Sequence, residues 1–293
     1  MDNRSDIRDF LTSRRARITP EQAGLLPGGG RRRVPGLRRE EVAVLAGVST
    51  DWYTRLEKGH ISGVSEDVLE AVARALQLDE AERTYLFDLA RAARPTRAPQ
   101  RRSRVTIQPP VQWMLDSMTG SAAFVANRRL DIVATNPLGW ALHAPLFDNP
   151  RGTANFARFQ FLDPRALDYY PNWDGAANVT VALLRAEAGR RPNDTLLREL
   201  VGELSTVSEQ FRTRWAAHNV RIHHNGVKQF HHPVVGGLDL AYNTLDLPTG
   251  DLRLTIYTAE PGTPSEDALK LLASWAATQA TTESPSAAVT ERP

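Results

Sequence analysis

The stretch from residue 39 to residue 59 reads REEVAVLAGVSTDWYTRLEKG, and it predicts two short helices joined by a tight turn. Val42 and Leu45 are three residues apart and are expected to face a core on the first helix. Gly47 suits the positive φ that such a turn needs, and Ser49 is a hydroxyl N-cap for the second helix. The spacing therefore predicts a helix-turn-helix, with an ordinary helical hairpin carrying a solvated charged face as the alternative.

This pattern resembles the Xre-type, or phage-repressor-like, helix-turn-helix family, in which the second helix enters the DNA major groove. Arginine is suited to bidentate contact with guanine, and aspartate accepts a hydrogen bond from cytosine N4. Carried over by position, the resemblance implies base contacts from the outward side of the second helix by Thr50, Asp51, Thr54 and Arg55. It also implies phosphate contacts by Arg38, Arg39 and Lys58.

A long segment precedes the motif where a compact phage-type domain has only a short turn. It contains Gly28–Gly30 followed by Arg31, Arg32 and Arg33. Long loops in compact domains are usually functional or disordered. We expect the three arginines to contact the DNA backbone or to enter a minor groove, with a merely solvated loop as the alternative.

Composition places the chain among globular proteins of about two domains, because it has 293 residues, 41% of them hydrophobic. Residues 1–104 carry a balance of +5 and the remainder a balance of −3, which indicates that the front part binds a polyanion. There are no cysteines, so disulfides, thiolate metal sites and cysteine nucleophiles are excluded. No apolar run approaches a membrane span, and the first residues lack a signal-peptide pattern, so a cytoplasmic protein without membrane contact is expected.

The first part of the chain predicts an all-helical domain at residues 1–95. Ile7, Phe10 and Leu11 fall at helical spacing, and further helical patterns cover about residues 38–46, 50–58, 65–76 and 80–94. Residues 96–110 are rich in proline and arginine and predict a linker. The composition of residues 278–293 predicts a disordered tail.

Residues 111–277 alternate between strand-like and helical patterns. Asn225-Gly226 stands between two strand-like runs and predicts a hairpin turn. An α+β domain with an antiparallel sheet and covering helices follows from this order. The predicted strands are 122–126, 130–135, 220–224, 227–232, 238–247 and 252–259, and the predicted helices are 137–143, 177–188, 195–204, 208–218 and 265–277.

The chain as a whole closely resembles the MmyB-like regulators of actinobacteria. The resemblance is carried by RRARITPEQAGL, by the helix-turn-helix, and by WAAHNVRIHHNGVKQFHHPVVGGLDLAYNTLDLP in the rear part, and it covers nearly everything except the tail. It implies that the long loop before the motif is normal. It also implies that the rear domain is PAS-like and senses a small, lipid-like molecule, a fatty acid being the leading idea.

Large aromatic residues are concentrated in the first half of the rear domain, where they would line a ligand cavity or simply form the core. A carboxylate ligand would also need a cation or hydrogen-bond donors at the pocket mouth. The candidate ligand-binding residues are Phe124, Trp140, Phe156, Phe159, Phe161, Trp173, Phe211, Arg214, Trp215, His218 and His223.

Four histidines, His223, His224, His231 and His232, flank Asn225-Gly226, but adjacent strand residues point to opposite faces and cannot converge on one metal ion. We therefore expect no metal, no cofactor and no catalytic residue. A metal-dependent enzyme built on these histidines stays open as an alternative. A DNA-binding adaptor or antitoxin whose rear domain binds a protein is another.

These patterns favour a DNA-binding transcriptional regulator that senses a small molecule. One helix-turn-helix rarely provides enough specific affinity, so a homodimer reading a palindromic double-stranded operator is expected. The ligand would shift DNA affinity by preferring one arrangement of the protein over another.

Overall fold

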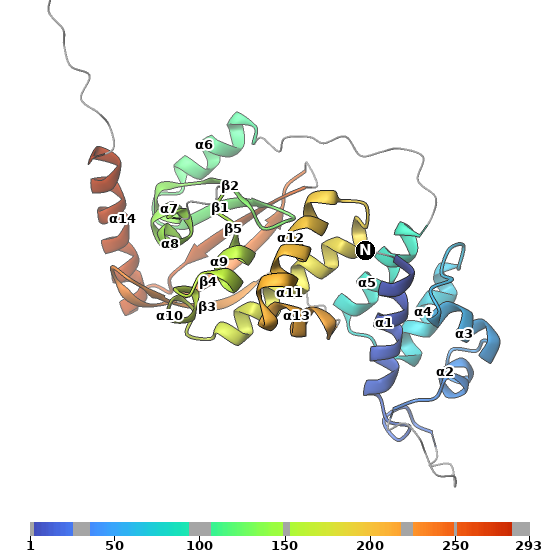
Figure 1. Ribbon diagram of the computed structural model, residues 1–293. Helices are drawn as coiled ribbons and strands as arrows, with labels where there is room; N and C mark the ends of the chain where they lie inside the picture. The colour runs from blue at the N-terminus through green and yellow to red at the C-terminus, as the bar shows by residue number, and fades with distance from the viewer. Residues whose placement is uncertain are drawn as a thin grey trace, which may run out of the picture. The chain divides into compact units, whose positions relative to one another are not determined.

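The computed structural model describes residues 3–25, 36–93, 107–148, 153–217, 225–248 and 251–282 (Figure 1). The chain divides into two compact units. The first unit combines residues 1–102 with 177–222, and the second unit combines residues 103–176 with 223–293. Helix α11 (Trp173–Arg190) begins among the residues of the second unit and ends in the first.

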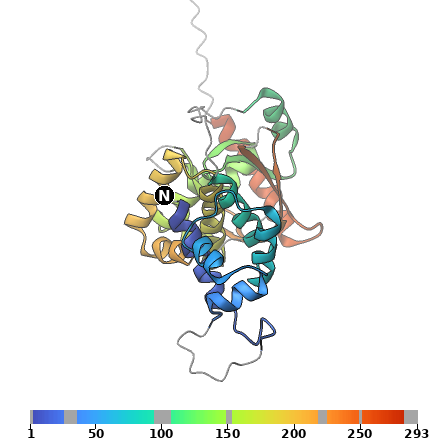
Figure 2. The ribbon, with the colours of Figure 1, turned by 90° about the vertical axis from the view of Figure 1, so that its right-hand side faces the viewer.

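The first unit contains the predicted N-terminal helices, which pack on one another around a shared core (Figure 2). Ile7, Phe10 and Leu11 are buried, as their helical spacing predicts, and Phe10 meets Tyr85 edge-on at 5.1 Å between ring centroids. The helices are α1 (Asn3–Arg17), α2 (Arg39–Leu45), α3 (Thr50–Glu57), α4 (Glu66–Ala75) and α5 (Glu80–Ala92).

Three helices from the middle of the chain complete the first unit: α11, α12 (Thr195–Val207) and α13 (Glu209–Ala216). The side of α11 approaches α5 closely at Gly189, because a Cβ atom there would lie 2.4 Å from Cε2 of Tyr85. The next residue, Arg190, donates a 2.7 Å hydrogen bond to Asp88 of α5. The helices that follow the rear domain's first strands are thus packed with the N-terminal helices.

The second unit is built on a five-stranded, fully antiparallel sheet with the order β2-β1-β5-β4-β3. In the residues that the structure describes, the long connection between β2 and β3 contains seven helices, four of which lie wholly in this unit. The strands are β1 (Ala122–Asn127), β2 (Ile132–Thr135), β3 (Asn225–His232), β4 (Gly236–Asp246) and β5 (Leu252–Thr258). The helices are α6 (Pro109–Ser117), α7 (Pro137–Leu142), α8 (Ala144–Phe147), α9 (Phe156–Leu162), α10 (Ala166–Tyr169) and α14 (Pro264–Thr282).

Alternation along the strands gives the sheet two different faces. On one face, Ala123 and Val125 of β1 and Leu254 of β5 pack with Leu115 of α6. The other face, called here the inner face, is covered by α7 to α10 and α14. Its side chains include Phe124, Phe230, Leu238, Leu240, Tyr242 and Tyr257.

Most predicted elements are present, and the differences have local causes. The predicted turn at Asn225-Gly226 is wrong, because both residues pair with β4 in the ladder opposite Asn243 and Tyr242. The turn that follows β3 lies instead between His232 and Gly236. The predicted strand 220–224 lies outside the described residues, and helices α6, α8, α9 and α10 were not predicted.

Candidate DNA-binding surface and ligand site

The turn between α2 and α3 has the geometry that its residues predict. Gly47 adopts φ +66°, and the side-chain oxygen of Ser49 accepts a 3.1 Å hydrogen bond from the backbone N–H of Trp52. Tyr53 is buried on the inward side of α3. Leu45, expected in the core, is instead 36% exposed, because α2 ends there and its buried side is formed by Val42 and Ala43.

The outward side of α3 presents the residues predicted to contact bases. Thr50, Asp51 and Arg55 are exposed, and Thr54 is partly exposed. The N-terminal half of the helix therefore offers hydroxyl and carboxylate groups, and Arg55 follows one turn later. These are groups that can donate to or accept from base edges.

Behind this surface, the buried carboxylate of Glu57 on α3 connects this helix to α1 and α2. It accepts hydrogen bonds from Nε and Nη2 of Arg15 at 2.8 and 3.0 Å and from Nε of Arg39 at 2.9 Å. Burial alone would raise the pKa of Glu57, but the hydrogen bonds and charges of the two arginines hold that pKa below its usual range. The cluster keeps one net positive charge, since two guanidinium groups share one carboxylate.

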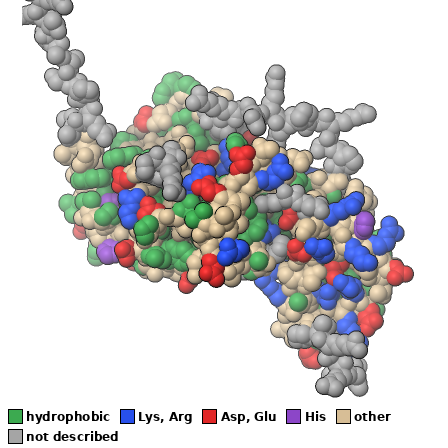
Figure 3. Space-filling model, viewed as in Figure 1, with side chains coloured by type: hydrophobic (Ala, Val, Ile, Leu, Met, Phe, Trp, Pro, Cys, Tyr) green, Lys and Arg blue, Asp and Glu red, His purple; other side chains and the backbone are tan. Residues whose placement is uncertain are grey.

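Basic side chains gather over the surface of α1 to α5, with acidic ones among them (Figure 3). Of the predicted phosphate contacts, Lys58 is exposed, Arg38 pairs with Glu40 at 3.3 Å, and Arg39 is half exposed while it pairs with Glu57. Arg31, Arg32 and Arg33 lie outside the described residues. Their phosphate contacts remain predictions.

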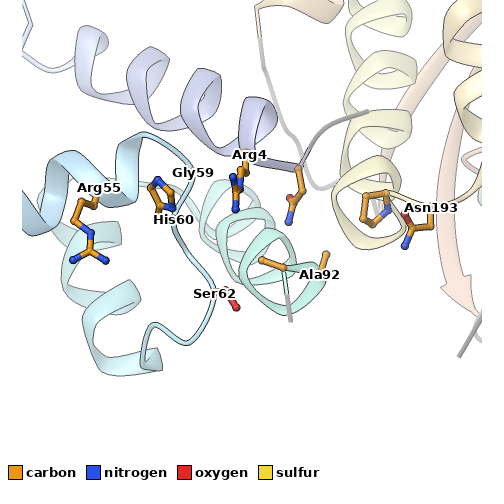
Figure 4. Close-up of a pocket in the computed structure, with 10 residues that line it drawn as sticks. Arg4, Arg55, Gly59, His60, Ser62, Ala92 and Asn193 are labelled. Carbon is orange, nitrogen blue, oxygen red and sulfur yellow. The ribbon is translucent and has the colours of Figure 1, made fainter. Parts of the chain in front are cut away.

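Two open hollows adjoin the C-terminal end of α3. The larger has a volume of about 580 Å³ and is lined by Arg4, Arg55, His60 and Ser62, with Asn193 from the connection between α11 and α12 on its far side (Figure 4). The smaller, of about 350 Å³, also includes Arg55, His60 and Ser62. Arg55 thus lines both hollows, and in the larger one its charge and that of Arg4 suit an anion such as a DNA phosphate.

The inner face of the second unit surrounds a fully buried imidazole. His143, at the end of α7, is 0% exposed, and the rings of Phe124, Phe156 and Tyr257 lie 5.2, 5.0 and 5.8 Å from it. Burial lowers the pKa of His143 well below its usual value, and the charge of Lys228 lowers it further, so the imidazole is neutral.

The hydrogen bonds of His143 define which nitrogen carries the proton. The single proton of the Tyr169 hydroxyl is donated to the carbonyl oxygen of Leu142 at 2.6 Å. The hydroxyl oxygen can therefore only accept in its 3.2 Å hydrogen bond with His143, so Nδ1 of His143 carries the proton. Nε2 is then an acceptor. It is buried and has no hydrogen-bond partner among the described residues.

Lys228 of β3 places a cation on this face. Its Nζ lies 4.7 Å from the ring centroid of Tyr170 and 5.6 Å from that of Phe230. Burial lowers the pKa of Lys228 from 10.5 to about 8. Lys228 was not among the predicted site residues, although the alternation of β3 puts Lys228, Phe230 and His232 on one face.

The structure gathers only part of the predicted ligand-binding set. Phe124, Phe156 and Phe159 join the inner-face core, Trp140 stacks on Trp275 of α14 at 5.8 Å, and Phe161 meets Trp173 edge-on. The inner face also holds residues that were not predicted to bind a ligand, namely His143, Tyr169, Tyr170, Lys228, Phe230 and Tyr257.

The remaining predicted ligand residues lie elsewhere. Phe211, Arg214 and Trp215 belong to α13 in the first unit, where Phe211 and Trp215 stack on each other at 5.5 Å. His218 and His223 lie outside the described residues. The assignment of these five residues to a ligand stays a prediction.

Histidines of β3 follow the alternation expected of a strand. His231 is exposed, and His232 is buried, where its Nε2 donates to the carbonyl oxygen of Ala141 at 3.0 Å and its Nδ1 accepts from the backbone N–H of Val234 at 3.2 Å. In the described part of the chain, no three His, Asp or Glu side chains are placed to hold a metal ion. None of the described helices is long and apolar enough to cross a bilayer.

Comparison with known protein families gives two matches along this chain. Residues 107–272 match the MmyB-like transcription regulator ligand binding domain. Residues 6–86 match a helix-turn-helix domain. No curated protein matches the chain. The first match runs through α11 to α13, the helices that pack with the N-terminal ones in the first unit.

Proposed function

The chain belongs to the MmyB-like transcription regulators, and from this we propose that it is an operator-specific regulator whose rear domain responds to an apolar, fatty-acid-like molecule. Its helix-turn-helix and ligand-binding domains make it a DNA-binding transcription regulator with a ligand-sensing domain. We propose the division that the sequence predicts, a DNA-binding domain at 1–95, a linker at 96–110, a ligand-binding domain at 111–277 and a tail at 278–293. Helix α6 begins within the last two linker residues, and α14 continues to Thr282.

The proposal of operator-specific DNA binding rests on the exposed side of α3. The turn at Gly47 and the cap at Ser49 fix the start of this helix, and Glu57 anchors its end. A rigid helix with Thr50, Asp51, Thr54 and Arg55 facing outward supports base readout in the major groove. Basic side chains beside it support phosphate contacts.

The strand order 2-1-5-4-3 supports a PAS-like sheet for the rear domain. Aromatic rings covering its inner face favour an apolar ligand, as binding sites are usually apolar with a few polar groups that fix orientation. The ligand would change operator affinity by binding one conformation better than another, with a typical coupling of about 1–3 kcal/mol.

The full chain tests this proposal directly. Selection from random double-stranded DNA should enrich one palindromic sequence, and light scattering should show a dimer, free or on that DNA. Native mass spectrometry of the purified protein should show a bound apolar acid, and its removal should change the operator affinity. Failure to enrich any sequence would overturn the proposal of sequence-specific DNA binding. Light scattering that shows only monomers, free and on DNA, would overturn the proposal of a dimer.

We expect Arg55→Ala to weaken operator binding by about 1–3 kcal/mol and to relax the preference at one base pair, because one bidentate contact to a base edge is lost. Fluorescence anisotropy with the selected operator and its single-base variants measures both effects. Arg74→Ala removes the same charge from the exposed end of α4 and serves as the control. Uniform weakening on all sequences by Arg55→Ala would assign Arg55 to a phosphate instead.

A further inference from the structure

We propose that the two hollows at the C-terminal end of α3 form one binding site for a mononucleotide, with the phosphate in the larger hollow and the base in the smaller one. All residues that line them belong to the first unit, so this site is separate from the sheet of the rear domain. Because Arg55 lines both hollows and is also the predicted base contact of α3, a bound nucleotide would compete with the operator.

The two hollows are neighbours, because Arg55, His60 and Ser62 line both of them. Figure 4 shows Arg4, Arg55 and His60 around the larger hollow, with Asn193 across from them. Their volumes of about 580 and 350 Å³ lie in the range of small-molecule sites. A phosphate, a ribose and a base can therefore be accommodated together.

The backbone after α3 fixes the floor of the larger hollow. Gly59 adopts φ +96°, and a Cβ atom there would lie 2.7 Å from the carbonyl oxygen of Arg4, so only glycine lets the chain pass this close to the start of α1. The backbone N–H groups of Gly59 and His60 donate to the carbonyl oxygens of Leu56 and Arg55 at 2.8 and 3.1 Å. Arg4 and Arg55 are thus brought to one hollow by a rigid backbone contact.

The charge of the larger hollow suits a phosphate ester. Arg4 and Arg55 are both exposed, and none of the described residues that line either hollow is an aspartate or a glutamate. A guanidinium group binds phosphate oxygens through two parallel N–H donors. The hydroxyl of Ser62 and the amide of Asn193 both donate and accept hydrogen bonds, as the hydroxyls of a ribose require.

The smaller hollow adds an apolar wall to these cations. Trp52, Val64 and Val68 line it, and Trp52 is held in place because it packs against the core of the first unit. Nucleobases stack on aromatic side chains of this kind. In duplex DNA the bases are stacked on one another and the backbone offers no such plane, so an indole beside two arginines favours a free nucleotide over a DNA phosphate.

Calorimetry on the full chain at low ionic strength tests the site with AMP, ribose 5-phosphate and adenosine. AMP should bind, and the other two should each bind at least about tenfold more weakly, because ribose 5-phosphate lacks the base and adenosine lacks the phosphate. No measurable binding of AMP by the wild type would overturn the site. Equal affinities for AMP and ribose 5-phosphate would overturn the placement of a base in the smaller hollow.

A matched pair of variants tests the phosphate contact. Arg4→Ala should weaken AMP binding about tenfold, the loss typical of one hydrogen bond to a charged group. Arg8→Ala removes the same charge from the next turn of α1, lines neither hollow, and should bind AMP as the wild type does. Equal AMP affinities of the wild type and Arg4→Ala would overturn the assignment.

The base contact is tested at Trp52. Trp52→Leu should weaken the binding of AMP and leave the binding of ribose 5-phosphate unchanged. Trp52→Phe keeps an aromatic ring and the packing against the core, and should retain most of the AMP affinity. AMP should also quench tryptophan fluorescence in the wild type more than in Trp52→Phe. Equal quenching in these two proteins would place the base away from Trp52.

Fluorescence anisotropy with the selected operator tests the competition. At an AMP concentration ten times its Kd, the apparent Kd for the operator should rise about tenfold, while the same concentration of adenosine should leave it unchanged. An unchanged Kd in saturating AMP would overturn the competition. Weaker binding of all DNA sequences by Arg4→Ala, with no AMP binding by the wild type, would assign the hollow to a DNA phosphate instead. Failure to select any operator would overturn the proposed function, but not the binding of AMP.

Discussion

Replacing Glu57 by alanine is expected to lower the free energy of unfolding of the first unit by about 3–5 kcal/mol. Glu57 is 1% exposed and receives three hydrogen bonds from Arg15 and Arg39. The variant leaves the guanidinium of Arg15, which is only 12% exposed, without its counter-charge. Arg39 is half exposed and can turn to solvent, so most of the loss comes from Arg15.

Glu40→Ala is the matched control for this change. Glu40 lies on α2 and pairs with Arg38 at the surface, so its loss should change stability by less than about 0.5 kcal/mol. Urea unfolding of the full chain measures both variants, and hydrogen exchange on peptides from α1 to α5 localises the effect. Equal stabilities of the two variants would show that the Glu57 cluster contributes nothing beyond a surface ion pair.

The same cluster predicts a pH dependence with a definite sign. Because Arg15 and Arg39 hold the pKa of Glu57 below its ordinary value of 4.5, the folded state binds a proton at this carboxylate less readily than the unfolded state does. Its contribution is complete above pH 4.5 and disappears as the pH falls through the lowered pKa. Between pH 6 and pH 3, the wild type should therefore lose more stability than Glu57→Ala, and parallel loss in the two proteins would contradict this.

Features that depend on neighbours in the sequence could be predicted well. The cap at Ser49 and the positive φ of Gly47 were predicted, as were the buried residues Ile7, Phe10 and Leu11, because helix periodicity and turn chemistry act within a few residues.

Predictions failed where contacts with distant parts of the chain determine the local structure. Asn225-Gly226 is a strong local turn signal, but pairing with β4 holds both residues in the ladder. Lys228 was missed for a related reason. Its environment is formed by Tyr170 of the α10 region and by the end of α7, which only the fold brings to β3. Alternation predicts the face of the strand to which a side chain points, but not what lies above that face.

The grouping of α11 to α13 with the N-terminal helices was not predictable from sequence either. Besides the contacts of Gly189 and Arg190 with α5, it involves a buried cation, Arg185 of α11, which is 1% exposed. Its guanidinium lies 3.9 Å from the ring centroid of Trp215, donates to the carbonyl oxygen of Trp215 on α13, and lies 3.7 Å from the carboxylate of Asp6 on α1. The side chain of Arg185 thus contacts both α13 and α1.

Arg185→Ala is expected to destabilise the first unit by about 3–5 kcal/mol, since it removes a buried ion pair and a cation–π contact and leaves a cavity. Thermal and urea unfolding measure the loss. Arg198→Ala, on the exposed side of α12, is the control and should change stability by less than about 0.5 kcal/mol. A change that small at Arg185 would mean that α11 is held to α1 by other contacts.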